Sequence, residues 1–173
     1  MSNPGTTPHQ PDRDPIDRIR ESTNPYGLPT QPPNPYAAWI KRVGAYLIDA
    51  LLVAVAYFPA WIGLIVSSSG GNDALATTLV VIGALLSLAV FVWNTCLRAG
   101  RTGYSIGKGV LGIKLVGERS GEPIGAGMAF VRYLLHIVDT LPLYLGYLWP
   151  LWDAKRQTFS DKIVHTVVLN QPQ

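Results

Sequence analysis

The sequence predicts an α-helical integral membrane protein with about three to four transmembrane or re-entrant helices and a small cytoplasmic β element. Hydrophobic residues make up 48% of the 173 residues and charged residues only 14%, whereas soluble domains carry about 25% charged residues. The apolar residues form long runs, and lipid is the solvent that suits such runs. Charged residues also occur inside these runs, where they are costly unless they have polar partners.

The N-terminal segment, residues 1–37, is predicted to be a disordered, proline-rich cytoplasmic tail. It holds nine of the fourteen prolines and no apolar run. Such a segment cannot bury enough surface to offset its ordering entropy, and its prolines favour polyproline II. Asn24-Pro25-Tyr26 recurs as Asn34-Pro35-Tyr36. The tail is therefore either a solvated linker or a docking segment for a protein partner.

A membrane domain is predicted over residues 38–170, and it begins with a helical hairpin. Two apolar runs, about 39–66 and 74–97, are each long enough at about 1.5 Å per residue to cross a hydrocarbon core of about 30 Å. The turn between them contains no basic residue, whereas basic residues precede the first run and follow the second. Because basic residues stay in the cytoplasm, the N-terminus is predicted to be cytoplasmic and the turn to lie outside.

A third apolar region, about 126–152, carries four residues unsuited to a lipid-facing helix: Arg132, His136, Asp139 and Pro142. Pro142 would break a helix, so one interpretation is a helix followed by a returning or interfacial segment. The other is one ordinary crossing, which would place the C-terminus outside. Two strand candidates, about 111–117 and 164–169, favour a cytoplasmic C-terminus, because a short strand needs a partner on the same side of the membrane.

Two sets of polar residues share one helical spacing. They are Arg42, Tyr46 and Asp49 and, ninety residues later, Arg132, His136 and Asp139. Residues at these spacings lie on one face of a helix. The match is either a weak internal repeat, as is typical of transporter folds, or a chance similarity of a few residues.

Asp49 lies about 10 Å along the helix axis from Arg42. Its short side chain cannot reach the headgroups from there, so it is either a buried structural partner or a proton or cation site. His136 beside Asp139 would suit proton transfer at neutral pH, or is simply hydrogen-bonded. We expect Arg42 and Asp49 each to have a partner on another helix. The candidates for Asp49 are Arg132, Asn94 and Tyr46.

These residues resemble the RDD family of bacterial membrane proteins, named for one arginine and two aspartates, over roughly residues 38–169. Arg42 and Asp49 match its first helix, and Arg132 and Asp139 match a later one. The other matching elements are Gly107-Lys108 with Gly112 and Lys114, and a tail with Arg156, Asp161 and Thr166-Val167-Val168. The second family aspartate is either Asp139 or Asp161. The family has no settled activity, and transport of ions or small solutes is suspected for it.

The predicted function is proton-coupled transport of a cation or small solute by a multi-pass protein of the bacterial cell membrane. The alternative is a structural or scaffolding membrane protein that recruits partners through its proline-rich head. The predicted site consists of Arg42, Asp49, Arg132, His136, Asp139 and Asp161, with Tyr46 and Asn94 in support. The bilayer is the expected partner, and so small a unit would have to form a homo-oligomer to enclose a pathway.

Several function classes are not expected. An enzyme is not predicted, because the sequence shows no nucleophile–base pair and no cluster of metal ligands. The single Cys96 excludes an intrachain disulfide and a cysteine-based zinc site. Neither a cofactor nor a metal is expected. Nucleic acid is not an expected partner, because no basic and aromatic platform is present.

Overall fold

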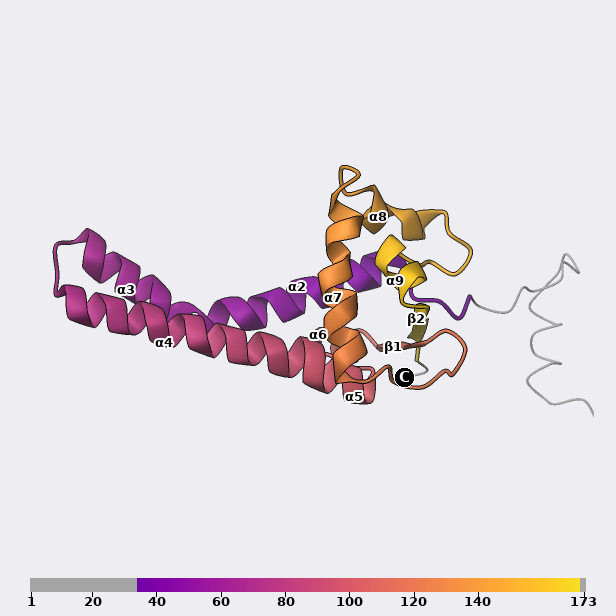
Figure 1. Ribbon diagram of the computed structural model, residues 1–173, viewed down its shortest axis with the longest axis horizontal. Coiled ribbons are helices and arrows are strands. Elements are labelled where there is room, and N and C mark those ends of the chain that lie inside the picture. The colour runs from indigo at the N-terminus through magenta and orange to yellow at the C-terminus, as the bar shows by residue number, and fades with distance from the viewer. Residues whose placement is uncertain (1–33, 172–173) are drawn as a thin grey trace, which may run out of the picture. The chain divides into compact units, whose positions relative to one another are not determined.

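The computed structural model describes residues 34–171. Most of the predicted disordered tail, including Asn24-Pro25-Tyr26, lies outside these residues. The described part consists of a long helical hairpin, a helix across one end of the hairpin, and a two-stranded sheet at that same end (Figure 1). We call this end of the hairpin, together with the helix and the sheet that lie there, the base. The hairpin residues in it are 39–49, at the start of the first helix, and 92–102, at the end of the second arm.

The hairpin has two arms. The first consists of α2 (Trp39–Ala56) and α3 (Phe58–Ser68), and the second of α4 (Asp73–Phe91), the π-helix η1 (Val92–Arg98) and α5 (Ala99–Thr102). The first arm bends by 50° between α2 and α3, where Pro59 removes a backbone donor. By length and composition, the second arm can cross a membrane, and up to three such spans result if each bent pair of helices is one span.

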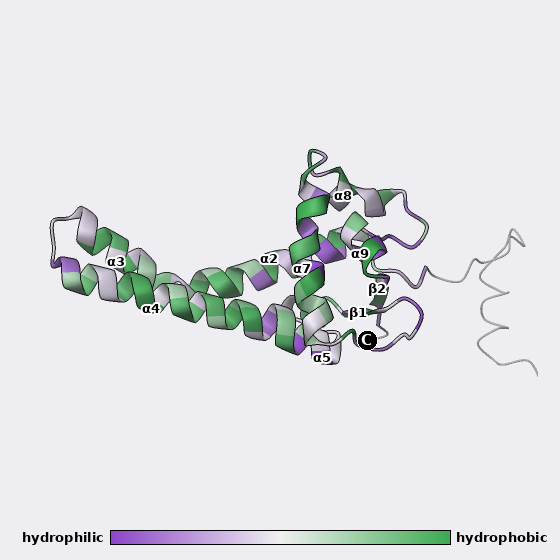
Figure 2. Cartoon of the chain, viewed as in Figure 1, coloured by the Kyte–Doolittle hydropathy of each residue, from purple (hydrophilic) through white to green (hydrophobic). Residues whose placement is uncertain are grey.

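Small residues let the two arms approach closely. A Cβ atom added at Gly83 would lie 2.4 Å from the backbone nitrogen of Ala60, and one at Gly63 would lie 2.6 Å from the carbonyl oxygen of Ala76. Glycine is therefore needed at both contacts. Close backbone approach through small residues is typical of helices that pack in lipid. The outward surface of the hairpin is largely apolar (Figure 2).

The base also contains two short helices, each of which leads into a strand. α6 (Ile106–Val110) leads into β1 (Ile113–Gly117), and α9 (Phe159–Ile163) leads into β2 (Thr166–Asn170). The strands pair antiparallel, with Leu115 opposite Val168. The predicted pairing of two short strands is therefore confirmed. The buried side chains of Ile113, Leu115 and Val168 form the small core beneath them.

Residues 34–37 belong to this sheet, although the sequence assigned them to the tail. Tyr36 forms a bridge with Leu169, and the backbone nitrogen of Ala37 donates to the carbonyl oxygen of Val168 over 2.8 Å. Asn170 N donates to the Pro35 carbonyl oxygen over 2.7 Å. The free edge of β2 thus orders the last tail residues through backbone hydrogen bonds.

The third apolar region is not one helix. α7 (Ala126–Thr140) ends before Pro142, and α8 (Leu145–Leu148) with the 3-10 helix η2 (Trp149–Leu151) follows a bend of 108°. Leu143 and Tyr144 have positive φ in the turn. The predicted helix over about 126–152 therefore needs correction: it has the break that Pro142 suggested. α7 lies across the base instead of alongside α3 and α4 (Figure 1).

Candidate functional site

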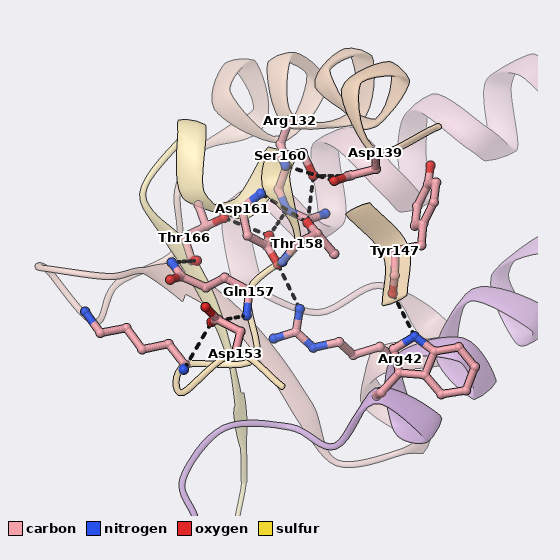
Figure 3. Close-up of polar contacts among 12 residues, drawn as sticks. Arg42, Arg132, Asp139, Tyr147, Asp153, Gln157, Thr158, Ser160, Asp161 and Thr166 are labelled. Carbon is pink, nitrogen blue, oxygen red and sulfur yellow. Dashed lines mark hydrogen bonds and ion pairs between the residues drawn. The ribbon is translucent and has the colours of Figure 1, made fainter. Parts of the chain in front are cut away.

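The charged residues of the base meet at Asp161, whose side chain is fully buried. Arg42 Nη1 lies 2.8 Å from Asp161 Oδ2, and Arg132 Nε lies 2.7 Å from Asp161 Oδ1. Thr166 donates a further hydrogen bond to Oδ1 over 3.0 Å. Figure 3 shows the two arginines reaching the carboxylate from α2 and α7. One carboxylate therefore ties together α2, α7 and the start of α9.

Local sequence places Asp161 for this role. Thr158 is the N-cap of α9 and accepts the backbone N–H of Asp161, while the Asp161 carboxylate accepts the backbone N–H of Thr158. This reciprocal capping box fixes the first turn of the helix. It leaves the carboxylate oxygens turned toward both arginines, so that one side chain caps its own helix and joins two others.

The carboxyl group of Asp161 is held in its ionised form. Burial by itself would raise the pKa of this carboxyl, but Arg132 and Arg42 outweigh burial through their charges and hydrogen bonds. The pKa of Asp161 consequently lies well below its usual range. Arg42 Nε and Nη2 are buried without a hydrogen-bond partner among residues 34–171. The ion pair with Asp161 is therefore the contact that compensates the buried charge of Arg42.

Asp49 forms a second polar cluster in α2. Its carboxylate accepts hydrogen bonds from Asn94 Nδ2 over 2.8 Å, Ser105 Oγ over 2.5 Å and Gly107 N over 2.8 Å. Asn94 belongs to the π-helix η1, and its Oδ1 accepts the backbone N–H of Ile106 over 2.8 Å. π-helical turns are rare in proteins, and those that occur are often found at functional sites. Here the turn carries the amide that joins the two arms of the hairpin to α6.

Lys108 lies beside this cluster. Its Nζ is 3.3 Å from Ser105 Oγ, which itself donates to Asp49. Burial lowers the pKa of Lys108, and the charge of Arg132 lowers it further, to about 8. Asp49 opposes these effects but does not cancel them. The ammonium group of Lys108 therefore loses its proton closer to neutral pH than an ordinary lysine does.

Asp139 forms a third cluster with His136 and Ser160. Asp139 Oδ2 is 2.6 Å from His136 Nδ1 and 2.6 Å from Ser160 Oγ, and Asp139 Oδ1 accepts the Ser160 backbone N–H over 3.2 Å. A Ser-His-Asp triad needs the two ring nitrogens to contact different partners. Here the same Nδ1 atom faces both Asp139 and Ser160, the latter at 2.9 Å. The cluster therefore lacks the geometry of a proton relay to a nucleophile.

Asp49 and Asp139 have equivalent surroundings. Each accepts the backbone N–H of the second residue of a short helix, Gly107 in α6 and Ser160 in α9. Each short helix begins at a side-chain N-cap and is followed by one residue of positive φ, Gly112 or His165, directly before a strand. The two strands pair with each other. The two aspartates are ninety residues apart, but the short helices that they contact are not, and Tyr46 is exposed whereas His136 contacts Asp139. The similarity is therefore limited to the two aspartates and the short helices that they contact.

The structure brings most of the predicted residues to the base but pairs them differently. Arg42 and Asp49 have partners on other elements, as expected, and Asn94 is a partner of Asp49. The prediction of Arg132 as a partner of Asp49 is wrong, because Arg132 donates to Asp161 instead. Tyr46 is also wrong as a partner, because its side chain is exposed.

Sequence reasoning missed Ser105, Thr158 and Ser160. Ser105 and Thr158 each precede a short helix, which is the usual place for an N-cap, and that signal could have located them. Within residues 34–171, no three His, Cys, Asp or Glu side chains are grouped so that they could hold a metal ion. The arrangement is a set of buried ion pairs and hydrogen bonds that joins α2, η1, α6, α7 and α9.

Sequence similarity relates this chain to known proteins. The sequence model of the RDD family matches residues 36–165. The chain is 39% identical over 155 residues to a protein named proline-rich antigen homolog from Mycobacterium tuberculosis, and 37% identical over 158 residues to a proline-rich antigen from Mycobacterium leprae. These alignments cover 80% of this chain but only 65% and 62% of the relatives. No solved structure matches the chain.

Replacing Asp161 with Asn should destabilise the protein by about 3–5 kcal/mol, because it leaves two buried arginines without a counter-charge. Glu118→Gln is the matched control: Glu118 pairs with Lys155, whose side chain is 49% exposed, and such pairs contribute about 0–1 kcal/mol. Thermal unfolding of the purified protein in detergent measures both. Equal, small effects of the two substitutions would show that Asp161 is not the central tie of the base.

The contribution of Asp161 should also depend on pH. Because its pKa is lowered in the folded state, the carboxylate stabilises the fold above the unfolded pKa of about 3.9 and loses this effect as pH falls through the folded pKa. The stability difference between wild type and Asp161→Asn should be constant from pH 7 to 5 and should shrink below about pH 4. Unfolding temperatures of both proteins at pH 7, 5, 4 and 3 measure it. A difference that stays constant to pH 3 contradicts this account.

Proposed function

The chain belongs to the RDD family, and from this membership and the geometry of the base we propose that it is a membrane-anchored, non-enzymatic scaffold. In this proposal the hairpin holds the protein in the membrane, and the base presents the proline-rich N-terminal segment to a protein partner. Membrane association follows from the family and the apolar helices. The scaffold role is the proposed step.

The attachment of the tail to the base is the observation that carries the proposal. Residues 34–37 pair with the edge of β2, and Arg156 Nη1 donates to the Tyr36 carbonyl oxygen over 3.1 Å. The proline-rich segment therefore leaves the membrane domain from a sheet that the base holds in place. Proline-rich segments suit recognition by aromatic grooves because their extended conformation costs little entropy to order. Two relatives bear names that refer to proline-rich sequence.

The polar residues of the base support a structural role. Asp161 and Asp139 are fully buried, and they and Asp49 each take part in at least three hydrogen bonds or ion pairs within the protein. Two surface hollows lie elsewhere: one of about 250 Å³ at residues 117–120 and 165, and one of about 170 Å³ between α3 and α4. Neither is lined by one of these carboxylates. Carboxylates occupied by internal donors in this way stabilise a fixed base.

The orientation proposed for the scaffold places both described ends in the cytoplasm. Basic residues gather at the base, including the exposed Lys41 and Arg101, whereas the turn of the hairpin contains Asp73 and no basic residue. The positive-inside rule then puts the base in the cytoplasm and the turn on the far side. The pairing of β1 with β2 keeps the C-terminal strand on the side of the base.

A photo-crosslinking amino acid at Tyr26 of the full-length protein should capture a defined partner in cells of the native host. The same amino acid at Thr77, near the turn of the hairpin, is the control and should not capture that partner. Deleting residues 2–33 should then remove the captured partner from the membrane fraction, whereas Asp49→Asn should leave it there. A partner that stays with the membrane after the deletion, or adducts that are equal at both positions, would contradict the scaffold role.

We also propose proton-coupled transport as a second function, favoured by the cluster around Asp49. Asp49 and Asn94 are hydrogen-bonded to each other at the π-helical turn inside the hairpin, and Lys108 of α6, with a pKa of about 8, lies beside Ser105, which donates to Asp49. The Lys108 ammonium group can exchange a proton near neutral pH. A chain with one hairpin would need several copies to enclose a pathway, so this function requires a homo-oligomer.

A flux assay in proteoliposomes tests this second function. Under transport, a pH gradient should drive cation-dependent proton movement that Asp49→Asn abolishes and Glu118→Gln preserves, because Asp49 alone of the two lies in the hairpin. A pH-sensitive dye inside the vesicles reports the movement. Wild-type protein that moves no more protons than empty vesicles, for sodium and potassium gradients of both directions, would rule out proton-coupled transport of these ions.

A further inference from the structure

α7 has its polar side turned inward and its apolar side turned outward. Arg132, His136 and Asp139 face α9 and its N-cap. On the opposite side, an exposed stripe follows helical spacing: Phe130, Leu134, Ile137 and Leu141. Leu134 is 54% exposed, Ile137 65% and Leu141 76%. A stripe of this kind in water would be an unfavourable apolar patch, and such patches mark contact surfaces.

The exposed apolar surface continues beyond α7. Leu143 is 87% exposed in the turn, and Tyr144, Leu151 and Trp152 are exposed along the returning segment. Tyrosine and tryptophan are the residues enriched at the boundary between lipid and water, because each has an apolar ring and a polar group. The outward face of α7 and α8 thus has the composition of a surface that meets the bilayer boundary.

Both ends of the segment are fixed at the base. Near the start of α7, Gly125 N donates to the Gly100 carbonyl oxygen over 2.8 Å. After the 108° bend, the Tyr147 carbonyl oxygen accepts a hydrogen bond from Trp39 Nε1 over 2.8 Å. Gly100 lies in α5, the last helix of the second arm, and Trp39 begins the first arm, so the segment starts and finishes at one end of the hairpin. α7 itself has 15 residues, about 22 Å at 1.5 Å per residue, which is shorter than a hydrocarbon core of about 30 Å.

We propose that α7, α8 and η2 lie in the plane of the bilayer boundary next to the base, with the apolar stripe of α7 inserted among the lipids of that leaflet. Apolar residues occur along both the hairpin and α7 (Figure 2). Exposed basic residues at the same end, Lys41 and Arg101, would attract the headgroups of anionic lipids. The inference uses the membrane location of the hairpin and is independent of the scaffold role.

The arrangement gives the base a fixed depth. The inward face of α7 carries Arg132, which holds Asp161, and the outward face contacts lipid. The central ion pairs therefore lie directly beneath the lipid-contacting helix, on its water side. This explains how one helix can contain an arginine, a histidine and an aspartate and still contact the membrane.

Spin-label depth measurements test the proposal in vesicles of phosphatidylcholine and phosphatidylglycerol. In a Cys96→Ala background, single cysteines replace Phe130, Leu134, Ile137 and Leu141, and each carries a nitroxide. Leu85, exposed in α4, is the reference for a deep position, and Ser120, exposed in the loop after β1, is the reference for water. Accessibility to oxygen and to a water-soluble nickel complex gives the depth of each label.

The four labels on α7 should have one shallow depth, to within a few Å, between the depths of Leu85 and Ser120. A steady change of about 16 Å over the 11 residues from position 130 to 141 would show a crossing helix instead. Labels as accessible to nickel as Ser120 would place the stripe in water. Spin–spin broadening that disappears on dilution with unlabelled protein would show a second copy on the stripe. A water-accessible Leu85 label would overturn the membrane location of the hairpin as well.

The labelled side chains point outward, so their replacement should leave the fold intact, and the unfolding temperature of each variant checks this. Any two of the four variants that fold are enough to distinguish one shared depth from a steady change along the helix, and a depth that follows position along the helix would overturn the proposal.

Discussion

The base of this protein depends on one buried carboxylate. Asp161 compensates Arg42 and Arg132, which come from helices far apart in the chain, and at the same time caps the helix on which it lies. Two buried arginines without this carboxylate would carry a desolvation cost of several kcal/mol each. The position of α7 against α2, and therefore the position of the apolar stripe on α7, follows from this arrangement.

The remaining contacts form two similar units. In each, an aspartate on a long helix accepts a backbone N–H at the start of a short helix, and the short helix leads into one strand of the shared sheet. The third residue of the short helix differs: it is Lys108 in α6 and Asp161 in α9. The same backbone arrangement thus carries a basic residue, Lys108, in one unit and an acidic residue, Asp161, in the other. The acid receives both arginines, and the lysine stays beside Asp49.

These contacts relate the fold to the membrane in a consistent way. The hairpin exposes apolar residues on its outer surface, small residues bring its arms together, and the buried carboxylates of the base accept internal hydrogen bonds and ion pairs. α7 separates the two environments, because one side contacts the ion pairs and the other is apolar. The tail residues 34–37 join the sheet on the polar side. An anchor with a rigid base and an attached proline-rich segment fits this division, and the chain spans about two thirds of the length of its mycobacterial relatives.

The sequence by itself determined the apolar runs of the hairpin, the pairing of two short strands and the set of charged residues that need partners, because these features depend on composition and local spacing. It left the break near Pro142 open against one continuous crossing, and the tertiary structure decided for the break. It did not determine which carboxylate each arginine contacts. Arg42 and Asp161 are 119 residues apart, and helical periodicity reports only neighbours on the same helix. The choice of Asp161 over Asp139 as the shared partner follows from the capping box of α9 and the packing of α7 across the base. The outward direction of the apolar stripe was likewise decided only in the tertiary structure, since the polar face of α7 turns toward whichever element satisfies its charges.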